Sequence, residues 1–191
     1  MQERTSKQNQ LLDAGLDVFY EKGFDRATID DIVGRADCGK GTFYRYFESK
    51  DALFNALENR FRELLLAELE KHCPYSLSVA DFFSASLKTF IKVFTTHQRL
   101  GLVKFTRDQQ TGTNTNSCRE ENLPSIAYLH KYIARAIDKG EIRKLKIDAI
   151  IGTMIGAVHF YLFRSFKLGK SLSDGELEDT VDIMLNGVIP S

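Results

Sequence analysis

Hydrophobic residues recur at three- and four-residue spacing along almost the whole chain, and no stretch of useful length alternates hydrophobic with polar residues as a half-buried strand would. Such spacing places the apolar side chains on one face of an α-helix. The longest stripe falls in residues 50–71, which would form a helix of about 30 Å. We therefore predict an all-α fold of about nine helices. The stripe consists of Leu53, Phe54, Leu57, Phe61, Leu64, Leu65 and Leu69.

Two sequence pairs predict where helices begin. Thr28 is followed three residues later by Asp31, and Ser173 is followed in the same way by Glu176. In such a capping box, the hydroxyl and the acidic side chain bond the free backbone amides of the first turn. We expect one helix to begin after Thr28 and the last helix to begin after Ser173.

Three further segments complete the predicted outline. Residues 40–46 form a brief helix after a short break, and residues 98–107 form a shorter helix in the second half of the chain. The most polar stretch, residues 108–122, is predicted to be a mobile loop because it is rich in Gln, Thr, Asn, Ser and Gly.

The composition limits the class of protein. Lys+Arg and Asp+Glu number 26 each among 191 residues, which excludes a histone-like polycation but leaves room for a local nucleic-acid site. The most apolar stretch, residues 150–163, is shorter than the roughly 20 residues that cross a bilayer, and the N-terminus shows no signal sequence. We expect a cytoplasmic protein without a membrane partner. The three cysteines form no CxxC pair and favour a reducing compartment: Cys38, Cys73 and Cys118.

Residues 28–46 carry the functional signal, because two helices joined by a short turn suit a helix-turn-helix. The second helix of this motif enters a major groove about 12 Å wide, so its leading end must be slim and carry hydrogen-bond donors. Gly39 and Gly41 are small enough for close approach, and Phe43 and Phe47 are spaced to face the core. The donors are Lys40, Thr42, Tyr44, Arg45 and Tyr46.

Charge is segregated around this motif. Residues 39–50 carry a net charge of +2, whereas residues 25–37 carry −2. One local surface could therefore meet phosphates while its neighbour repels them. Lys50 lies in the first turn of its helix, where backbone amides point outward and can bind a phosphate.

Three segments in order resemble the TetR/AcrR (tetracycline-repressor-like) family of transcriptional regulators. They are Glu-Lys-Gly-Phe at 21–24, Ala-Thr-Ile-Asp-Asp-Ile at 27–32, and Gly-Lys-Gly-Thr-Phe-Tyr-Arg-Tyr-Phe-Glu-Ser-Lys at 39–50. The resemblance covers about residues 5–60. Beyond this range, the chain is similar to the family only in length and in its helical character.

The resemblance implies a role for each matching position. Thr28 would contact phosphate, Tyr44 would contact the DNA backbone, and Lys50 would hold a phosphate. The turn departs from the family pattern, since Asp37-Cys38-Gly39 stands where Gly-Val-Ser is common, so a hydroxyl cap is lost and a carboxylate is gained. The implied DNA-binding residues are Thr28, Lys40, Gly41, Thr42, Tyr44, Arg45, Tyr46 and Lys50.

The two parts of the chain are expected to have different tasks. Residues 1–49 would form the helix-turn-helix DNA-binding domain, and residues 50–191 would form an effector-binding and dimerisation domain, connected by the helix at 50–71. The helix at 148–168 is apolar nearly all round and needs a second covered surface, so we predict a homodimer through the last two long helices. The predicted interface residues are Ile151, Ile155, Val158, Leu162, Leu177, Val181, Met184, Leu185 and Val188.

The function we predict is a dimeric DNA-binding transcriptional regulator, a repressor that a small apolar or aromatic ligand releases from its double-stranded DNA operator. Aromatic residues could line the pocket for this unidentified effector. The alternative is a helical ligand-binding or scaffold protein that has lost DNA binding. The candidate pocket residues are Phe82, Phe83, Phe90, Phe94, Phe105, Tyr128, Tyr132, His159 and Tyr161.

Enzymatic chemistry finds no support in the sequence. There is no P-loop, GxSxG or HExxH motif, and the four histidines are far apart. We therefore expect no enzyme, no cofactor and no metal site. Cys38 beside the recognition helix leaves open either a redox switch or a small buried apolar residue.

Overall fold

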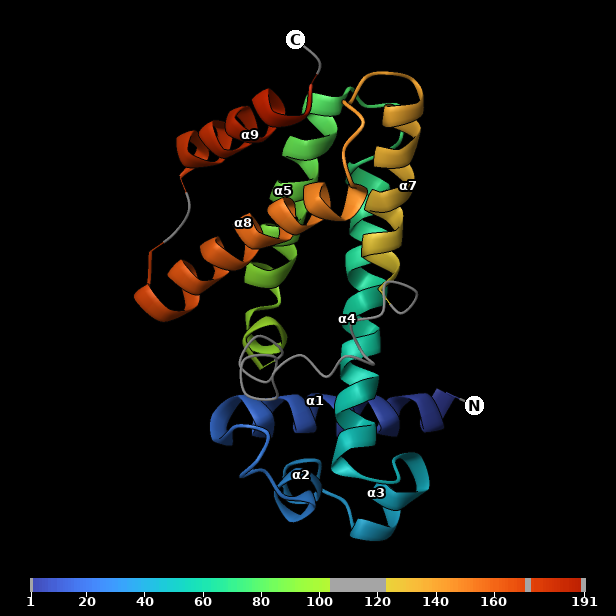
Figure 1. Ribbon diagram of the computed structural model, residues 1–191. Coiled ribbons are helices and arrows are strands. Elements are labelled where there is room, and N and C mark those ends of the chain that lie inside the picture. The colour runs from blue at the N-terminus through green and yellow to red at the C-terminus, as the bar shows by residue number, and fades with distance from the viewer. Residues whose placement is uncertain (1, 104–122, 171–172, 190–191) are drawn as a thin grey trace. The chain divides into compact units, whose positions relative to one another are not determined.

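The computed structural model describes residues 2–103, 123–170 and 173–189, which are helical almost throughout (Figure 1). No strand occurs in these ranges, so the predicted all-α fold is confirmed. The helices are α1 (Gln2–Lys22), α2 (Ile29–Arg35), α3 (Lys40–Tyr46), α4 (Lys50–His72), α5 (Val79–Thr96), α7 (Pro124–Asp138), α8 (Ile147–Leu168) and α9 (Asp174–Val188).

Both predicted capping boxes are present. The Thr28 hydroxyl accepts a hydrogen bond from the Asp31 amide at 3.2 Å, and the Asp31 carboxylate accepts one from the Thr28 amide at 3.1 Å. Ser173 and Glu176 form the same pair of bonds at 3.3 and 3.1 Å. Each box satisfies two amides at the start of its helix, which explains why α2 and α9 begin where they do.

The predicted shorter helix is described only in part. Residues 98–103 are helical, whereas residues 104–107 lie outside the described part of the chain. The segment predicted as a mobile loop, residues 108–122, also lies outside it.

The chain forms two compact units. The described part of the first consists of the residues up to Phe61 together with 97–103, and that of the second consists of residues 62–96 and those from 123 onward. Helix α4 contributes residues to both units.

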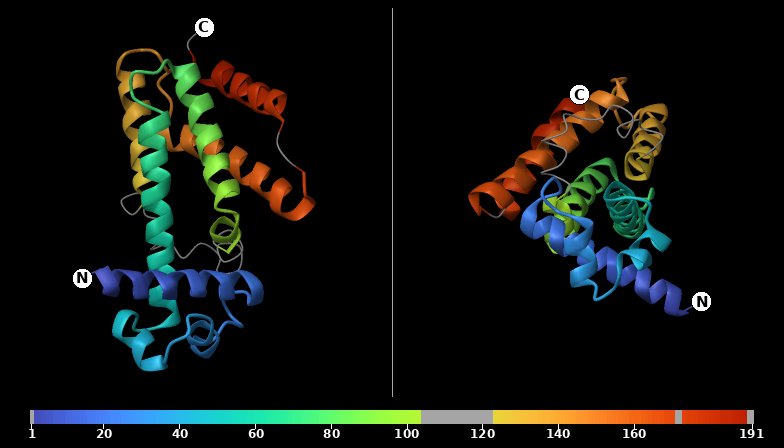
Figure 2. Two further views of the ribbon diagram at one scale, coloured as in Figure 1. Left: turned by 180° about the vertical axis from the view of Figure 1, so that it is seen from behind. Right: turned by 90° about the horizontal axis from the view of Figure 1, so that it is seen from below.

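The first unit is built on α1. Helix α2 packs against α1 and α3 packs against α2 (Figure 2). The rings of Phe19, Phe24 and Phe54 meet with centroids 5.2–5.9 Å apart, and Phe19 and Phe54 are almost fully buried. This cluster joins α1, the segment before α2 and the start of α4 into one core.

In the second unit, α5 packs against α8 and α9, and α7 packs against α8. The Phe82 ring on α5 stacks on the Tyr132 ring on α7, with centroids 3.5 Å apart and planes inclined by 2°. Tyr161 on α8 bonds the Thr180 hydroxyl on α9, at an O···O distance of 2.5 Å. Aromatic side chains therefore link the helices of this unit.

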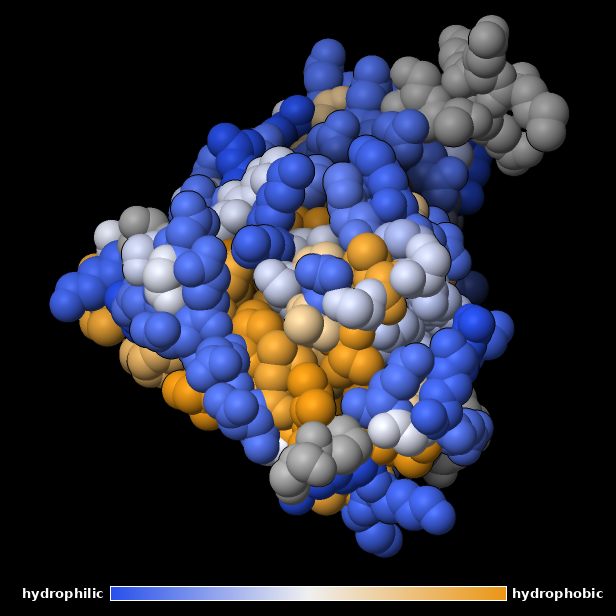
Figure 3. All heavy atoms as spheres, turned by 90° about the horizontal axis from the view of Figure 1, so that it is seen from above, coloured by the Kyte–Doolittle hydropathy of each residue, from blue (hydrophilic) through white to orange (hydrophobic). Residues whose placement is uncertain are grey.

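Helix α8 is the single helix in the described chain that is long and apolar enough to cross a membrane by length and composition, a test that core helices also pass. Here it packs within the second unit against α5, α7 and α9. Part of its apolar surface stays exposed at Phe160, Phe163 and Leu168. In the space-filling view of Figure 3, hydrophobic residues likewise reach the surface between hydrophilic ones.

Candidate nucleic-acid interface

Helices α2 and α3 and their connection form a helix-turn-helix (Figure 1). In the connection, Asp37 adopts a left-handed backbone with φ of 46°, and the Cys38 amide bonds the Val33 carbonyl at 3.0 Å. Gly39 is the N-cap of α3, and no side chain caps this helix. The hydroxyl cap that the sequence lacks is therefore missing in the structure, and the first amides of α3 are free of side-chain partners.

The inner face of α3 is aromatic and buried, as predicted. Phe43 is 0% exposed and Phe47 is 5% exposed, with ring centroids 5.9 Å apart. On the outer face, Tyr44 is 55% exposed and meets the Phe43 ring edge-on at 5.5 Å, while Arg45 lies exposed with its guanidinium 5.2 Å from the Tyr46 ring. The buried rings thus fix α3 in place and direct Tyr44 and Arg45 toward solvent.

Lys40, at the first position of α3, forms an ion pair that the sequence did not reveal. Its Nζ lies 2.8 Å from a carboxylate oxygen of Asp30 on α2, and both side chains are exposed. The hydrogen bond with Asp30 and its negative charge raise the pKa of Lys40. A phosphate that approaches Lys40 therefore meets a cation already shared with a carboxylate.

Lys50, at the start of α4, binds backbone of the first unit. Its Nζ donates to the Phe24 carbonyl at 2.7 Å and to the Ala27 carbonyl at 2.9 Å, and it lies 4.4 Å from the Phe24 ring centroid. The third nearby acceptor is the Asp25 carbonyl at 3.4 Å. Because an ammonium has three donors, a phosphate contact by Lys50 requires it to exchange one of these carbonyls.

The charged residues around α2 are neutralised internally. Lys22 on α1 bonds the Asp31 carboxylate at 2.6 Å, and this bond, followed by those from Thr28, lowers the pKa of Asp31 to about 2. Arg35 donates two bonds of 2.6 Å to Glu21, which lower the pKa of Glu21. This fork geometry is the strongest form of a guanidinium–carboxylate pair.

The eight residues implied in DNA binding all lie in the first unit. A contact that sequence reasoning missed is made by Lys7 on α1, whose Nζ bonds the Ala36 carbonyl at 3.3 Å after the end of α2. No local pattern could reveal it, since the two residues are 29 positions apart. Thr28, Lys40, Gly41, Tyr44 and Arg45 are exposed, and Thr42, Tyr46 and Lys50 are half-buried.

The predicted interface residues lie on α8 and α9, but most face the core of their own chain. Ile151, Val158, Leu162, Leu177, Val181, Met184 and Val188 are buried, and Ile155 and Leu185 are half-buried. The large apolar side chains that these helices expose are instead Phe160, Phe163, Leu168 and Ile183.

The structure brings together only some of the predicted pocket residues. Phe82, Tyr128 and Tyr132 form one aromatic cluster with Tyr75, a residue that the sequence did not single out because it stands alone in the turn between α4 and α5. Phe82, Phe83, Phe90, Tyr132 and Tyr161 are buried, Phe94 and Tyr128 are half-buried, His159 is exposed, and Phe105 lies outside the described residues.

A buried aromatic face, an exposed face with cations and hydroxyls, and a short turn define the first unit as a helix-turn-helix of the DNA-binding kind. Comparison with known proteins agrees. Residues 11–57 match the family model described as bacterial regulatory proteins, tetR family. This segment of the chain is therefore a helix-turn-helix similar to that of the TetR family of transcriptional regulators, and the resemblance identified in the sequence is confirmed.

Two curated relatives match part of the chain. The HTH-type transcriptional regulator YvdT of Bacillus subtilis (strain 168) is 48% identical over 58 residues, which is 30% of each chain. The HTH-type transcriptional repressor DhaR of Mycobacterium sp. (strain GP1) is 41% identical over 91 residues, which is 45% of this chain and 46% of DhaR. The chain therefore spans less than half the length of either relative in these matches.

The fold of the whole chain has a counterpart among solved structures. A TetR family transcription regulator from Marinobacter aquaeolei VT8 superposes with a TM-score of 0.81 over 100% of both chains, at 16% sequence identity. At this identity the similarity concerns the fold alone. Family and relatives are transcriptional regulators, so the expectation that the chain is not an enzyme is confirmed.

Proposed function

We propose that this protein is a homodimeric repressor that binds a double-stranded DNA operator and leaves it when a small apolar or aromatic ligand binds. Residues 1–49 would act as the DNA-binding domain and residues 50–191 as the effector-binding and dimerisation domain. The observation that carries the DNA-binding part is α3, with Phe43 and Phe47 buried and Tyr44 exposed. The repressor name of DhaR supports repression as the direction of control.

The chemistry of contact follows from the outer face of α3. Gly39 and Gly41 have no atom within 4 Å of where a Cβ would lie, so the leading end of the helix presents a slim surface. Lys40 and Arg45 would meet phosphates or base edges, and the Tyr44 hydroxyl would bond the DNA backbone. Thr28 would bond phosphate by turning its hydroxyl from Asp31 toward the DNA.

Dimerisation would use the exposed apolar surface of α8 and α9. Phe160, Phe163 and Ile183 are 56%, 45% and 73% exposed, which is unfavourable for large apolar side chains in water. A second copy that covers them would give the two-fold symmetry of an operator dimer. Two recognition helices would then lie about 34 Å apart, or a multiple of that distance.

Release by a ligand would act through the spacing of the two recognition helices. Helix α4 supplies residues to both units. A ligand that shifts α4 in the second unit would therefore also shift the α4 residues of the first unit. A spacing that mismatches successive grooves lowers the affinity for the operator. A protein with this role would act in the cytoplasm.

The DNA-binding proposal is tested with duplexes that the purified protein selects from a random-sequence library. We expect Lys40→Ala and Tyr44→Phe to weaken binding in fluorescence anisotropy, and Lys50→Ala to reduce its salt dependence by about one charge. Lys71→Ala, at an exposed lysine near the end of α4, is the matched control and should bind as the wild type does. If all three variants retain wild-type affinity and salt dependence, the assignment is wrong.

The dimer is tested by sedimentation equilibrium. Ile183→Glu and Phe163→Glu should produce monomers that bind the selected duplex weakly. Leu145→Glu changes an apolar residue of 39% exposure outside both helices and should leave the dimer intact. If both α8–α9 variants form dimers of unchanged stability, the dimer interface lies elsewhere on the chain.

A further inference from the structure

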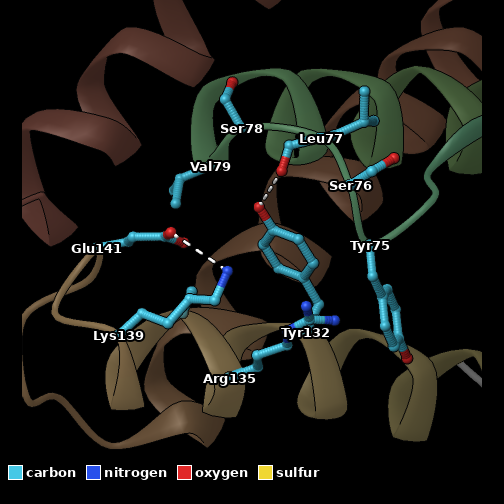
Figure 4. Close-up of a pocket in the computed structure, with 10 residues that line it drawn as sticks. Tyr75, Ser76, Leu77, Ser78, Val79, Tyr132, Arg135, Lys139 and Glu141 are labelled. Carbon is cyan, nitrogen blue, oxygen red and sulfur yellow. Dashed lines mark hydrogen bonds and ion pairs between the residues drawn. The ribbon is translucent and has the colours of Figure 1, made fainter.

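A cleft of about 540 Å³ opens in the second unit between α7 and the turn that leads into α5 (Figure 4). Its volume falls within the roughly 300–1,000 Å³ that is usual for small-molecule sites. Tyr132 is the single residue that this cleft shares with the pocket predicted from the sequence. The walls are formed by Tyr75, Ser76, Tyr132, Arg135, Lys139 and Glu141, among others.

The aromatic wall of the cleft is rigid. Tyr132 is 3% exposed and stacks on Phe82. Its hydroxyl donates a hydrogen bond to the Leu77 carbonyl at 2.9 Å, which Figure 4 shows as a dashed line. Tyr75 packs its ring 4.7 Å from that of Tyr128 and donates to the Tyr128 carbonyl at 3.0 Å. Both rings are therefore held before any ligand arrives, which reduces the entropy that binding costs.

The two phenols carry no negative charge at neutral pH. Burial raises the pKa of Tyr132 and of Tyr75 above the usual value near 10. Each phenol is also a donor to a backbone carbonyl, which only its protonated form can be. The rings are consequently neutral, and the half-buried Tyr75 offers more of its surface to the cleft than Tyr132, which is 3% exposed.

Two cations line the α7 side of the cleft: Arg135 on α7 and Lys139, the residue that caps its C-terminus. Lys131, one turn before Arg135, does not line the cleft but places its Nζ 5.9 Å from the Tyr75 ring centroid. Across residues 131–146 the chain carries six cations and two carboxylates. An anion that enters the cleft would therefore meet a positive potential.

Two carboxylates near the cleft already have partners. Glu141 pairs with Lys139 at 3.6 Å, and the Asp81 carboxylate accepts a bond of 2.7 Å from the Ser78 hydroxyl. No carboxylate in the described ranges pairs with the guanidinium of Arg135. Of the two cations that line the cleft, Lys139 is therefore paired, and Arg135 has no carboxylate partner in the described ranges.

We propose that this cleft binds a small aromatic carboxylate, with its ring against Tyr75 and Tyr132 and its carboxylate on the Arg135 guanidinium. A guanidinium binds a planar carboxylate with two parallel hydrogen bonds, a geometry that a lysine cannot provide. Binding as such does not depend on the DNA-binding role, but its meaning as an effector signal rests on the proposed function.

Benzoate is the probe, and isothermal titration calorimetry of the full chain is the measurement. We expect saturable binding of benzoate, and Arg135→Gln should weaken it about tenfold or more, since a hydrogen bond to a charged group is worth at least that factor. Lys144→Gln is the matched control, because Lys144 is an exposed cation of the same basic segment that does not line the cleft. Benzamide, which is neutral and of the same shape, should not bind.

Three results would overturn the proposal: no saturable benzoate binding, equal binding of benzamide, or equal weakening by Arg135→Gln and Lys144→Gln. Anisotropy with the selected duplex on the same samples separates the site from its regulatory role. If benzoate binds through Arg135 but leaves DNA affinity unchanged, the site stands and its role as effector site fails. If the chain binds no duplex while benzoate still binds through Arg135, the proposed function fails and the site stands.

Discussion

Gly15 on α1 lies where the first unit has no room for a side chain. A Cβ at this position would lie 2.5 Å from Cδ2 of Leu53 on α4, whereas carbon atoms in contact are about 3.5–4.0 Å apart. Leu53 is 0% exposed, so its methyl group cannot turn into solvent. Gly15→Ala therefore forces a shift of about 1 Å in a packed core, at a cost of about 1–3 kcal/mol.

The helix itself favours alanine over glycine by about 1 kcal/mol, so the net loss for Gly15→Ala is about 0–2 kcal/mol. Gly34 on α2 supplies the matched control, because no atom lies within 4 Å of its Cβ position and Gly34→Ala should gain up to about 1 kcal/mol. The two variants should differ by about 1–3 kcal/mol, or about 2–12 °C in thermal midpoint for a chain of this size.

Circular dichroism melts at one protein concentration measure this difference. A further check is the Leu53→Ala background, in which Gly15→Ala should become neutral or stabilising because the clashing methyl groups are gone. A Gly15→Ala variant that melts at or above Gly34→Ala would refute the packing argument.

Three other perturbations have defined outcomes. Gly39→Ser should raise the free energy of unfolding in urea by a few tenths of a kcal/mol by capping α3, whereas Gly39→Ala should lower it; equal effects would exclude capping. Asp30→Asn should raise affinity for the selected duplex about two- to fivefold by freeing Lys40, and a similar gain in a Lys40→Ala background would contradict this mechanism. Arg164 and the Ser173 amide lower the pKa of Glu176 to about 2 from 4.5, so the stability that this carboxylate contributes is present above about pH 4.5 and is lost as the pH falls toward 2. In acid denaturation, Glu176→Gln should reduce the loss of unfolding free energy over that pH range. An unchanged pH profile would show that the Glu176 carboxylate makes no such contribution.

Local signals account for the accuracy of the helix predictions. The sequence predicts a helix over residues 40–46 and α3 has these bounds, because Gly39 before it and the extended Phe47 after it are encoded within a few residues. The capping boxes at Thr28 and Ser173 are equally local. Such signals need no knowledge of the tertiary fold.

Contacts across the sequence could not be predicted in this way. The spacing of Lys50 suggested only a cation at a helix start, and its bonds to carbonyls 23 and 26 residues away appear only in the fold. The sequence likewise did not indicate that Lys40 pairs with Asp30. A net charge over a segment describes which surface is positive, but not which cation is already paired.

The apolar stripes of α8 and α9 show the limit of periodicity most clearly. A stripe indicates that a face is covered, but not what covers it. Val158 and Val181 are buried inside the chain, while Phe160 and Ile183, on other faces of the same two helices, remain exposed. Distinguishing buried from exposed positions on these helices required the positions of α5 and α7 as well.

The central claim is that the outer face of α3 lies against DNA, and photo-crosslinking tests it directly. Tyr44 and Tyr20 are both exposed tyrosines of the first unit, at 55% and 42%, but only Tyr44 lies on α3. With p-benzoylphenylalanine at each position in turn and the selected duplex bound, we predict a covalent DNA adduct from position 44 and none from position 20. An adduct from position 20 but not from position 44, or equal yields from both, would contradict the account.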